Sequence, residues 1–509
     1  MIGPLFALAV ALSPPAPGAD AGTPDRPSEE DLFGTSGPPD QSPEPLPGDG
    51  GLEPRPGEQE IFGVPVAGPA ADAGVESSEK ARDQAILVDK LPYEAEDLAP
   101  SNPLTVGGLL YLRTQLSASQ GQPPSQYYLS APSLMDTYLD ARPNDRVRGF
   151  VLVRTLFDPT FNPNQPTPAG LVPPSVANPD FLLDQMWIKF DVAHEVFVTA
   201  GRQHVKWGAA HFWFPNDLLN PVRLQPLAVF DQRTGVTMIK ANLPLSDEHL
   251  NVYGMGLFEG YQPADQLGAL GGAARVEYVL GAAEVGVDMV GSEGMHNRYG
   301  GDLSFGILDV DLYAEWAFTD GIDVPLWKLQ PLPPGFPPGL SPLPGIPEEV
   351  ASPGYRPQVA TGANYSLRYG NNRVLTFGAE YFYNGFGYTD PSIYPLLFLT
   401  GDATFFYLGQ QYLGLYLLAD KPGSWYNSTI NLSTIGNLSD HSWISRIDFF
   451  QMVLTHLRVE AFAQVHYGGD GEFHLSLNLP ASSFGGVSIP AIQVGAPVFD
   501  TGLALRMAF

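Results

Sequence analysis

The chain has no cysteine among its 509 residues, which excludes disulfides, thiolate zinc sites and a cysteine nucleophile. Charged residues are also scarce, at 16%, against roughly 25% in a soluble domain. After the N-terminus, no stretch reaches the roughly 18 consecutive apolar residues that a membrane-spanning helix needs. The chain is therefore neither a disulfide-rich scaffold nor a helical membrane bundle, and its composition is unusual for a soluble domain.

Negative charge is abundant but unevenly placed. The net charge is −29, and residues 20–100 carry 19 Asp and Glu against 5 Lys and Arg, a net charge of −14. The remaining −15 is spread over residues 101–509. Nucleic acid is excluded as a partner, because phosphate binding requires clustered Lys and Arg. The first fifth of the chain thus differs in kind from the rest.

The N-terminus has the features of a secretory signal. An apolar run, residues 5–12, is followed by Ala19, Asp20 and Ala21, which have the A-x-A form of a cleavage site. No Lys or Arg precedes the run, and a buried N-terminal strand is the alternative interpretation. We expect a signal peptide over residues 1–21. Residues 22–103 are rich in Pro, Gly, Asp and Glu and cannot bury enough apolar surface to offset their ordering entropy, which predicts a disordered acidic tether.

From residue 104 onward the sequence alternates with period two, which places neighbouring side chains on opposite faces of a strand. Many of the alternating segments have 9–14 residues, whereas strands of soluble proteins average about 5–6 and tilted membrane-spanning strands need about 9–11. In the clearest segment one face is apolar, formed by Leu457, Val459, Ala461, Ala463, Val465 and Tyr467. The other face holds Arg458, Glu460, Phe462, Gln464 and His466.

Eighteen segments of this kind can be counted between residues 104 and 509, including residues 472–479 and none between residues 118 and 146. Because lipid permits only helices or closed barrels, they predict an all-β fold, a transmembrane antiparallel β-barrel of 16–18 strands. The shortest connections fall at the end opposite to the one expected if the C-terminus lies at the periplasmic side. This conflict indicates a miscount of one strand near an end of the barrel, in residues 118–146 or 480–498.

The last strand carries a further signal, since its apolar face ends on the final residue of the chain. That face contains Phe499, Leu503, Leu505, Met507 and Phe509. An alternating last strand that ends in Phe resembles the insertion signal of outer-membrane β-barrel proteins of Gram-negative bacteria. The resemblance implies location in the outer membrane, contact with lipid and lipopolysaccharide, and recognition by the barrel insertion machinery. A soluble β-sandwich that happens to end in Phe is the alternative.

A second motif spans residues 201–223 and has the form G-R-Q-x-x-x-W-G followed by N-x-x-N-P. It resembles a segment of several porin-like outer-membrane barrels and matches it at Gly201, Arg202, Gln203, Trp207, Gly208, Asn220 and Pro221. The two glycines permit close approach of the backbone. One interpretation is a segment folded into the pore as a constriction; the other is a structural corner that fixes register. Candidate pore residues here are Arg202, Gln203, Trp207, Asn216, Asp217, Arg223 and Arg233.

Charges on the polar faces give further pore candidates: Arg458, Glu460 and His466. Other polar-face charges of both signs are Lys189, Asp191, Asp311, Glu315, Glu380 and Arg506. Charges that face the centre of a barrel fit a water-filled lumen, where rings of charge set ion selectivity. The alternative is a plugged interior in which the charges pair with one another.

Signals of catalysis are weak. Neither G-x-S-x-G nor H-E-x-x-H occurs, and the spacing of His194, His204 and His211 matches no zinc site. We expect no enzyme activity, cofactor or metal. The predicted function is passive diffusion of small solutes or ions through a porin-like channel. Two alternatives remain: a structural or assembly barrel whose tail binds a periplasmic partner, and an outer-membrane hydrolase.

Overall fold

The computed structural model describes residues 103–509, apart from short gaps. The predicted signal peptide and the tether up to residue 102 lie outside the described residues. So does Pro221 of the second motif. The gaps are residues 162–177, 221, 230, 232, 246–248, 259–269, 324, 335–343, 351–353, 371–372, 424, 480–481, 485–486 and 490–491.

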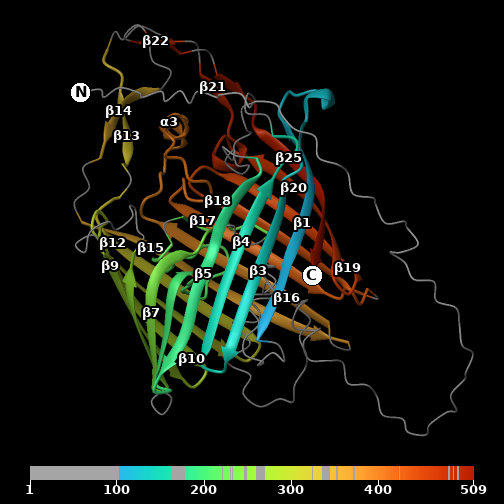
Figure 1. Ribbon diagram of the computed structural model, residues 1–509. Helices are drawn as coiled ribbons and strands as arrows, with labels where there is room; N and C mark the ends of the chain where they lie inside the picture. Colours follow the sequence, from blue (N-terminus) through green and yellow to red (C-terminus); the bar gives the residue numbers. More distant parts are fainter. Residues whose placement is uncertain are drawn as a thin grey trace, which may run out of the picture. The chain divides into compact units, whose positions relative to one another are not determined.

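The described residues form a closed antiparallel β-barrel of 18 strands. Each strand pairs with its neighbour along the chain, and the first strand, β1, pairs with the last, β25, from Leu109↔Ala508 to Ser119↔Pro497. Figure 1 shows β1, β3, β4 and β5 side by side and tilted, with β13, β14 and α3 beyond one end. The predicted fold class and the predicted strand number are confirmed.

The barrel strands are β1 (Leu104–Ser119), β3 (Ser133–Asn144), β4 (Val147–Phe157), β5 (Asp180–Val192), β6 (Val196–Gln203), β7 (Val236–Leu245), β8 (Leu250–Leu257), β9 (Gly271–Leu280), β10 (Ala283–Gly291), β11 (Arg298–Ile307), β12 (Val310–Asp320), β15 (Tyr355–Tyr369), β16 (Arg373–Asn384), β17 (Gln411–Asp420), β18 (Ser428–Asn437), β19 (Ser442–Leu454), β20 (Leu457–Gly468) and β25 (Pro497–Ala508). The connections contain β2 (Tyr128–Ser130), β13 (Trp327–Pro331), β14 (Gly345–Glu349), β21 (Leu477–Leu479), β22 (Ser482–Phe484), β23 (Val487–Ile489), β24 (Ile492–Val494), the helix α3 (Tyr394–Thr400) and the 3-10 turns η2 (Pro124–Gln126), η5 (Pro391–Ile393) and η6 (Glu472–His474).

Within the described part of the chain, no helix is both long and apolar enough to cross a membrane.

The barrel wall is apolar on its outer face and charged on its inner face, which is the reverse of a soluble protein. Leu503 and Leu505 on the outer face of β25 are 63% and 45% exposed, whereas Arg458 and Glu460 on the inner face of β20 are buried. An exposed apolar wall around a charged interior is unfavourable in water. It is favourable when the hydrocarbon core of a membrane surrounds the wall. The period-two pattern therefore places apolar residues against lipid rather than in a core.

The strand count was right, but two of the segments were assigned wrongly. β3 was not predicted from the sequence, and its outward face has Thr137 between only two large apolar residues, Met135 and Leu139. Its inward-facing Asp136 and Asp140 bind Arg154 and Arg148 of β4. Conversely, residues 472–479 were predicted as a barrel strand, but they form η6 and the short β21 outside the barrel sheet. Because one strand was missed and one was predicted wrongly, the total number of strands is unchanged. The predicted direction of every strand between these two positions is reversed.

With β3 in place, every long connection lies at one end of the barrel and the other end has only short turns. The C-terminus lies at the short-turn end, where the backbone of Phe509 exchanges hydrogen bonds with Gly108 (2.8 and 3.0 Å). The two-residue turns are residues 145–146, 281–282, 308–309 and 455–456, and the longest connections are residues 204–235, 321–354, 385–410 and 469–496. The conflict in loop orientation is thereby resolved.

Candidate functional site: an inserted segment and an arginine wall

Residues 204–235, which connect β6 to β7, fold into the barrel and are called the inserted segment below. Residues 210–220 are all buried, although they belong to no helix or strand. Irregular backbone can be buried only if its polar groups find partners. The barrel wall supplies these partners with two inward-facing carboxylates, Glu380 of β16 and Glu315 of β12.

Glu380 binds three consecutive backbone N–H groups of the inserted segment. Its carboxylate accepts from His211 N (2.7 Å), Phe212 N (3.2 Å) and Trp213 N (2.8 Å), and from the hydroxyl of Tyr313 (2.8 Å). These charge-assisted bonds replace the water that a loop would otherwise bind. One buried side chain thus fixes the path of the segment across the lumen.

Glu315 holds the backbone on both sides of this point, through Ala210 N (2.5 Å) and Asn216 N (3.3 Å). Gly208 has φ 94°, and a Cβ there would collide with the Glu315 carboxylate, so glycine is required for two reasons. A Cβ at Gly201, with φ 126°, would collide with the carbonyl of Met186. The predicted role of both glycines in close backbone approach is confirmed.

Aromatic packing adds to these bonds. Trp213 of the inserted segment stacks on Phe382 (5.4 Å between ring centroids) and packs at a tilt against Tyr412 (5.3 Å). Its indole N–H donates to the carbonyl of Phe406 (3.0 Å). His211 stacks on Tyr416 at 4.0 Å. The lumen next to β15–β19 is therefore filled by packed side chains rather than by solvent.

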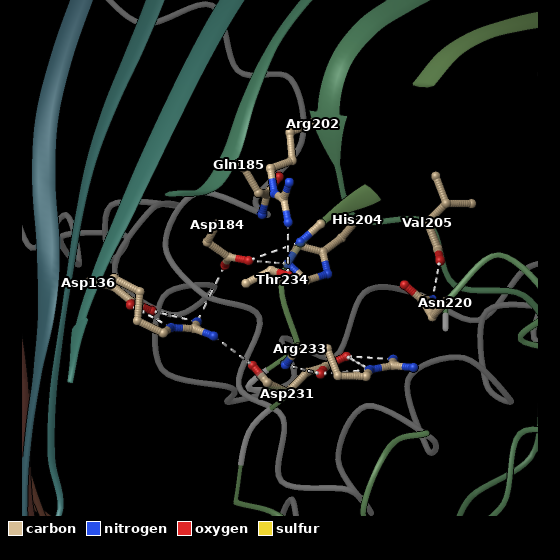
Figure 2. A network of polar contacts seen from close by, with 12 residues as sticks. Asp136, Asp184, Gln185, Arg202, His204, Val205, Asn220, Asp231, Arg233 and Thr234 are labelled. Atoms are coloured by element: carbon tan, nitrogen blue, oxygen red, sulfur yellow. Dashed lines mark hydrogen bonds and ion pairs between the residues drawn. The ribbon is translucent and has the colours of Figure 1, made fainter. Parts of the chain in front are cut away.

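The two ends of the inserted segment are clamped together at the wall by Asp184 of β5 (Figure 2). Its carboxylate binds His204 Nε2 at 2.8 Å and accepts from the Gly235 backbone N–H at 3.2 Å. Arg202 donates to the Thr234 hydroxyl at 3.0 Å. Burial alone would lower the pKa of His204, but the hydrogen bond and charge of Asp184 outweigh it and raise that pKa.

A second group of contacts closes the segment on itself. Arg233 binds both Asp231 (2.6 Å) and Asp217 (2.5 Å), and Asn220 donates to the carbonyl of Val205 at 3.1 Å. Burial would raise the pKa of Asp231, but its bonds to Arg233 lower it below the ordinary value. The segment is thus a folded unit with its own ion pairs.

The remaining pore candidates of this motif lie at other places inside the barrel. Gln203 is buried in the wall and donates to the carbonyl of Thr199 (3.2 Å), and Trp207 packs in a buried apolar cluster with Met238. Arg223 donates to Gln358 Oε1 at 2.9 Å. Six of the seven predicted pore residues of the motif thus bind or pack inside the barrel, whereas Arg202 secures the end of the inserted segment.

Four arginines line the inner face of β19, β20, β25 and β1, and we call this surface the arginine wall: Arg113, Arg446, Arg458 and Arg506. Arg458 and Arg506 share Glu460 (2.9 and 2.8 Å). Arg446 binds Asp448 at 2.6 Å.

Aromatic rings separate the guanidinium groups of this wall. Arg113 and Arg446 lie over the ring of Phe462, at 4.4 and 4.3 Å from its centroid. Arg458 lies over Phe450 at 4.9 Å. Because four guanidinium groups face three carboxylates, Asp448, Glu460 and Asp500, the wall carries an excess of one positive charge.

His466, the remaining pore candidate, bonds through Nε2 to Asp500 at 2.9 Å and through Nδ1 to the carbonyl of Phe473 at 2.7 Å. The sequence-based candidates did not include Arg113, Arg446 or Asp184. The alternation of polar and apolar residues in each strand indicates that these three side chains face inward. The sequence of one strand does not show which residues of other strands they contact. Glu315 and Glu380 were recognised as inward charges, without their role in holding the inserted segment.

No family model and no curated protein matches this chain. Among solved structures it is similar to a mutant of the porin of Rhodopseudomonas blastica, at 11% identity over 80% of this chain and 100% of that chain, with a TM-score of 0.37. It is also similar to OccK11 (OpdR) of Pseudomonas aeruginosa, at 9% identity over 79% and 96%, with a TM-score of 0.43. For OccAB4 of Acinetobacter baumannii the identity is 8% over 80% and 98%, with a TM-score of 0.45. At these values the comparison concerns barrel architecture alone.

Proposed function

We propose that this protein is a porin-like channel of the bacterial outer membrane, through which small solutes or ions diffuse passively. One observation carries the proposal: the barrel wall is apolar outside and charged inside. Leu503 and Leu505 are exposed on the outer face, while Arg458 and Glu460 are buried within. A lipid surrounding and a polar lumen are the conditions under which this arrangement is stable.

In this proposal the inserted segment narrows the lumen, and the conducting path follows the arginine wall. The excess positive charge of that wall supports a preference for anions, because lumenal charges set selectivity. Arg113 and Arg446 lie over the ring of Phe462, and the carboxylates near them are Asp448 and Asp500. With Glu460 included, the four guanidinium groups of the wall exceed its three carboxylates by one charge.

The regions outside the described residues enter the proposal as expectations from sequence. Residues 1–21 act as a signal peptide, and residues 22–103 act as a disordered acidic tether.

The outer face of β25, with Phe499, Leu503, Leu505, Met507 and Phe509, contacts lipid and is recognised by the insertion machinery.

Reconstitution into planar lipid bilayers tests the proposal. We expect discrete conductance steps and a reversal potential that reports anion preference in a salt gradient. A barrel that is folded, as judged by heat-modifiable migration on gels, but remains electrically silent would contradict the channel and favour a structural or assembly barrel.

A further inference from the structure

A buried carboxylate, Glu472 of η6, joins two long connections at the same end of the barrel. Its Oε1 accepts hydrogen bonds from the backbone N–H groups of Tyr407 (3.1 Å) and Leu408 (3.2 Å), in the connection from β16 to β17. Its Oε2 accepts from the hydroxyl of Tyr412 on β17 (2.6 Å) and from Nδ2 of Asn437 at the end of β18 (2.9 Å). One side chain therefore fastens η6 to its neighbours at this end of the barrel.

A second buried carboxylate, Asp440, lies beside Glu472 in the turn between β18 and β19. Its Oδ2 accepts from the backbone N–H of Glu472 (2.9 Å) and from Nδ2 of Asn437 (2.8 Å). The amide of Asn437 is held in this orientation because its Oδ1 accepts from the Ser439 N–H (3.0 Å). One amide nitrogen thus binds both carboxylates, and no Lys, Arg or His side chain in the described part of the chain bonds to either.

Two carboxylates in this position cannot both be ionised at low cost, because like charges repel strongly where water is excluded. Burial raises the pKa of Glu472 to about 8; the hydrogen bond from Tyr412 opposes this rise, and the charge of Asp440 adds to it. The pair therefore retains a proton while η6 is docked. When η6 leaves, the carboxyl of Glu472 enters water, where its ordinary pKa is 4.5.

The other titratable groups around Glu472 are three phenols and one imidazole: Tyr394 of α3, Tyr407, Tyr412 and His466 of β20. Burial raises the pKa of Tyr394 and of Tyr407, so these phenols keep their protons. His466 contacts the neighbouring residue, since its Nδ1 binds the carbonyl of Phe473 at 2.7 Å. Because imidazoles change charge between about pH 5 and 8, a test must separate His466 from Glu472.

We propose that residues 469–476, called the η6 latch below, stay docked while the Glu472–Asp440 pair keeps a proton and are released when the pair loses it, so that alkaline pH opens this end of the barrel. The docked latch binds one proton more tightly than the released latch. The ratio of released to docked latch should therefore rise about tenfold for each pH unit between 4.5 and 8, and level off above 8.

Release of the latch would also remove part of the packing that fills the lumen. Phe473 packs against Phe406 (5.3 Å between ring centroids) and Tyr412 (6.4 Å). These rings belong to the apolar cluster that contains Trp213 of the inserted segment, or pack against it. Loss of Phe473 therefore uncovers the side chains that close the lumen next to β15–β19.

A single spin label measures the release. The chain has no cysteine, so Ser476→Cys supplies one labelling position, on an exposed residue of the latch. In the full chain, refolded in detergent, we expect a mobile component of the EPR spectrum that grows between about pH 5 and about pH 9 and is lost when the pH is lowered again. The label reports docking whether or not the barrel conducts. A rise in conductance over the same range would follow only if the proposed channel function holds.

Three further changes in the Ser476→Cys background identify the titrating group. Glu472→Gln cannot ionise, and its amide can donate to Asp440, so the label should stay immobile over the whole range. Glu348→Gln on β14 is the matched control and should keep the pH response, because Glu348 is exposed and binds Lys328. His466→Gln removes the imidazole and should also keep the response.

The proposal is overturned if the label on the unmodified latch has the same mobility at about pH 5 and about pH 9. It is also overturned if Glu472→Gln, shown to be folded by heat-modifiable migration, keeps the pH response or is already mobile at the acidic end. Loss of the response in His466→Gln would overturn it as well, because the imidazole would then control the latch.

Discussion

Glu380→Gln tests whether one buried carboxylate holds the inserted segment in the lumen. The glutamine keeps the size and one acceptor oxygen, but its amide NH₂ replaces the second acceptor and faces backbone N–H donors. At least one of the N–H groups of His211, Phe212 and Trp213 then loses its partner. An unmatched buried donor costs about 1–3 kcal/mol, and each 1.4 kcal/mol is a factor of ten. The undocked population should therefore rise about 5- to 150-fold.

Limited trypsin digestion measures this population, because the segment contains Lys206 and Arg223, which become accessible when it leaves the lumen. When opening and closing are fast relative to cleavage, the cleavage rate follows the open fraction. We expect faster cleavage within the segment and a larger single-channel conductance. Glu348→Gln is the matched control, since Glu348 is exposed on β14 and binds only Gln330 and Lys328 among its described contacts.

If Glu380→Gln is cleaved no faster than Glu348→Gln, the carboxylate does not hold the segment, and the aromatic packing around Trp213 is sufficient. Such a result would refute the reasoning from backbone hydrogen bonds.

Four further predictions concern other parts of the protein. Burial raises the pKa of Glu472, in η6 outside the barrel strands, from 4.5 to about 8. Folding therefore favours the protonated carboxyl. The contribution of this group to the free energy of unfolding is complete below pH 4.5 and is lost as the pH rises through 8. The temperature of heat-modifiable unfolding should fall between about pH 4.5 and pH 8 and level off above pH 8, and Glu472→Gln should flatten this profile; an unchanged profile would exclude Glu472 as its cause. Arg446→Gln on the arginine wall should shift the reversal potential toward cations, whereas Lys328→Gln on the exposed β13 should not; equal shifts would argue against a path along the wall. Phe509→Asp should refold in detergent, because the paired backbone of this residue is kept, but should fail to assemble in cells; equal failure in both settings would mean that Phe509 is a packing residue. Limited proteolysis should remove the tail and leave a resistant core that begins near Leu104, and a protected tail would show that the predicted tether is folded.

The sequence alone determined the class of fold, because strand periodicity is a local property. Alternation of Leu503, Leu505 and Met507 with inward-facing positions can be read from neighbouring residues, and lipid then requires that the strands close into a barrel. The sequence also marked Gly201 and Gly208 as points of close backbone approach. Where the outward face of a strand has few large apolar residues, as in β3 with Thr137 between Met135 and Leu139, the local signal is weak.

Only the tertiary structure decided what the inward-facing charges do. Glu380 and the backbone of His211 are separated by 169 positions in the chain, and no local pattern relates them. Their contact depends on the register of the strands and on the path of the inserted segment across the lumen. The same holds for the arginine wall, because Arg113 and Arg446 meet at Phe462 only after the first strand has paired with the last. Local alternation fixes which face a side chain occupies, whereas its partner across the barrel is set by closure.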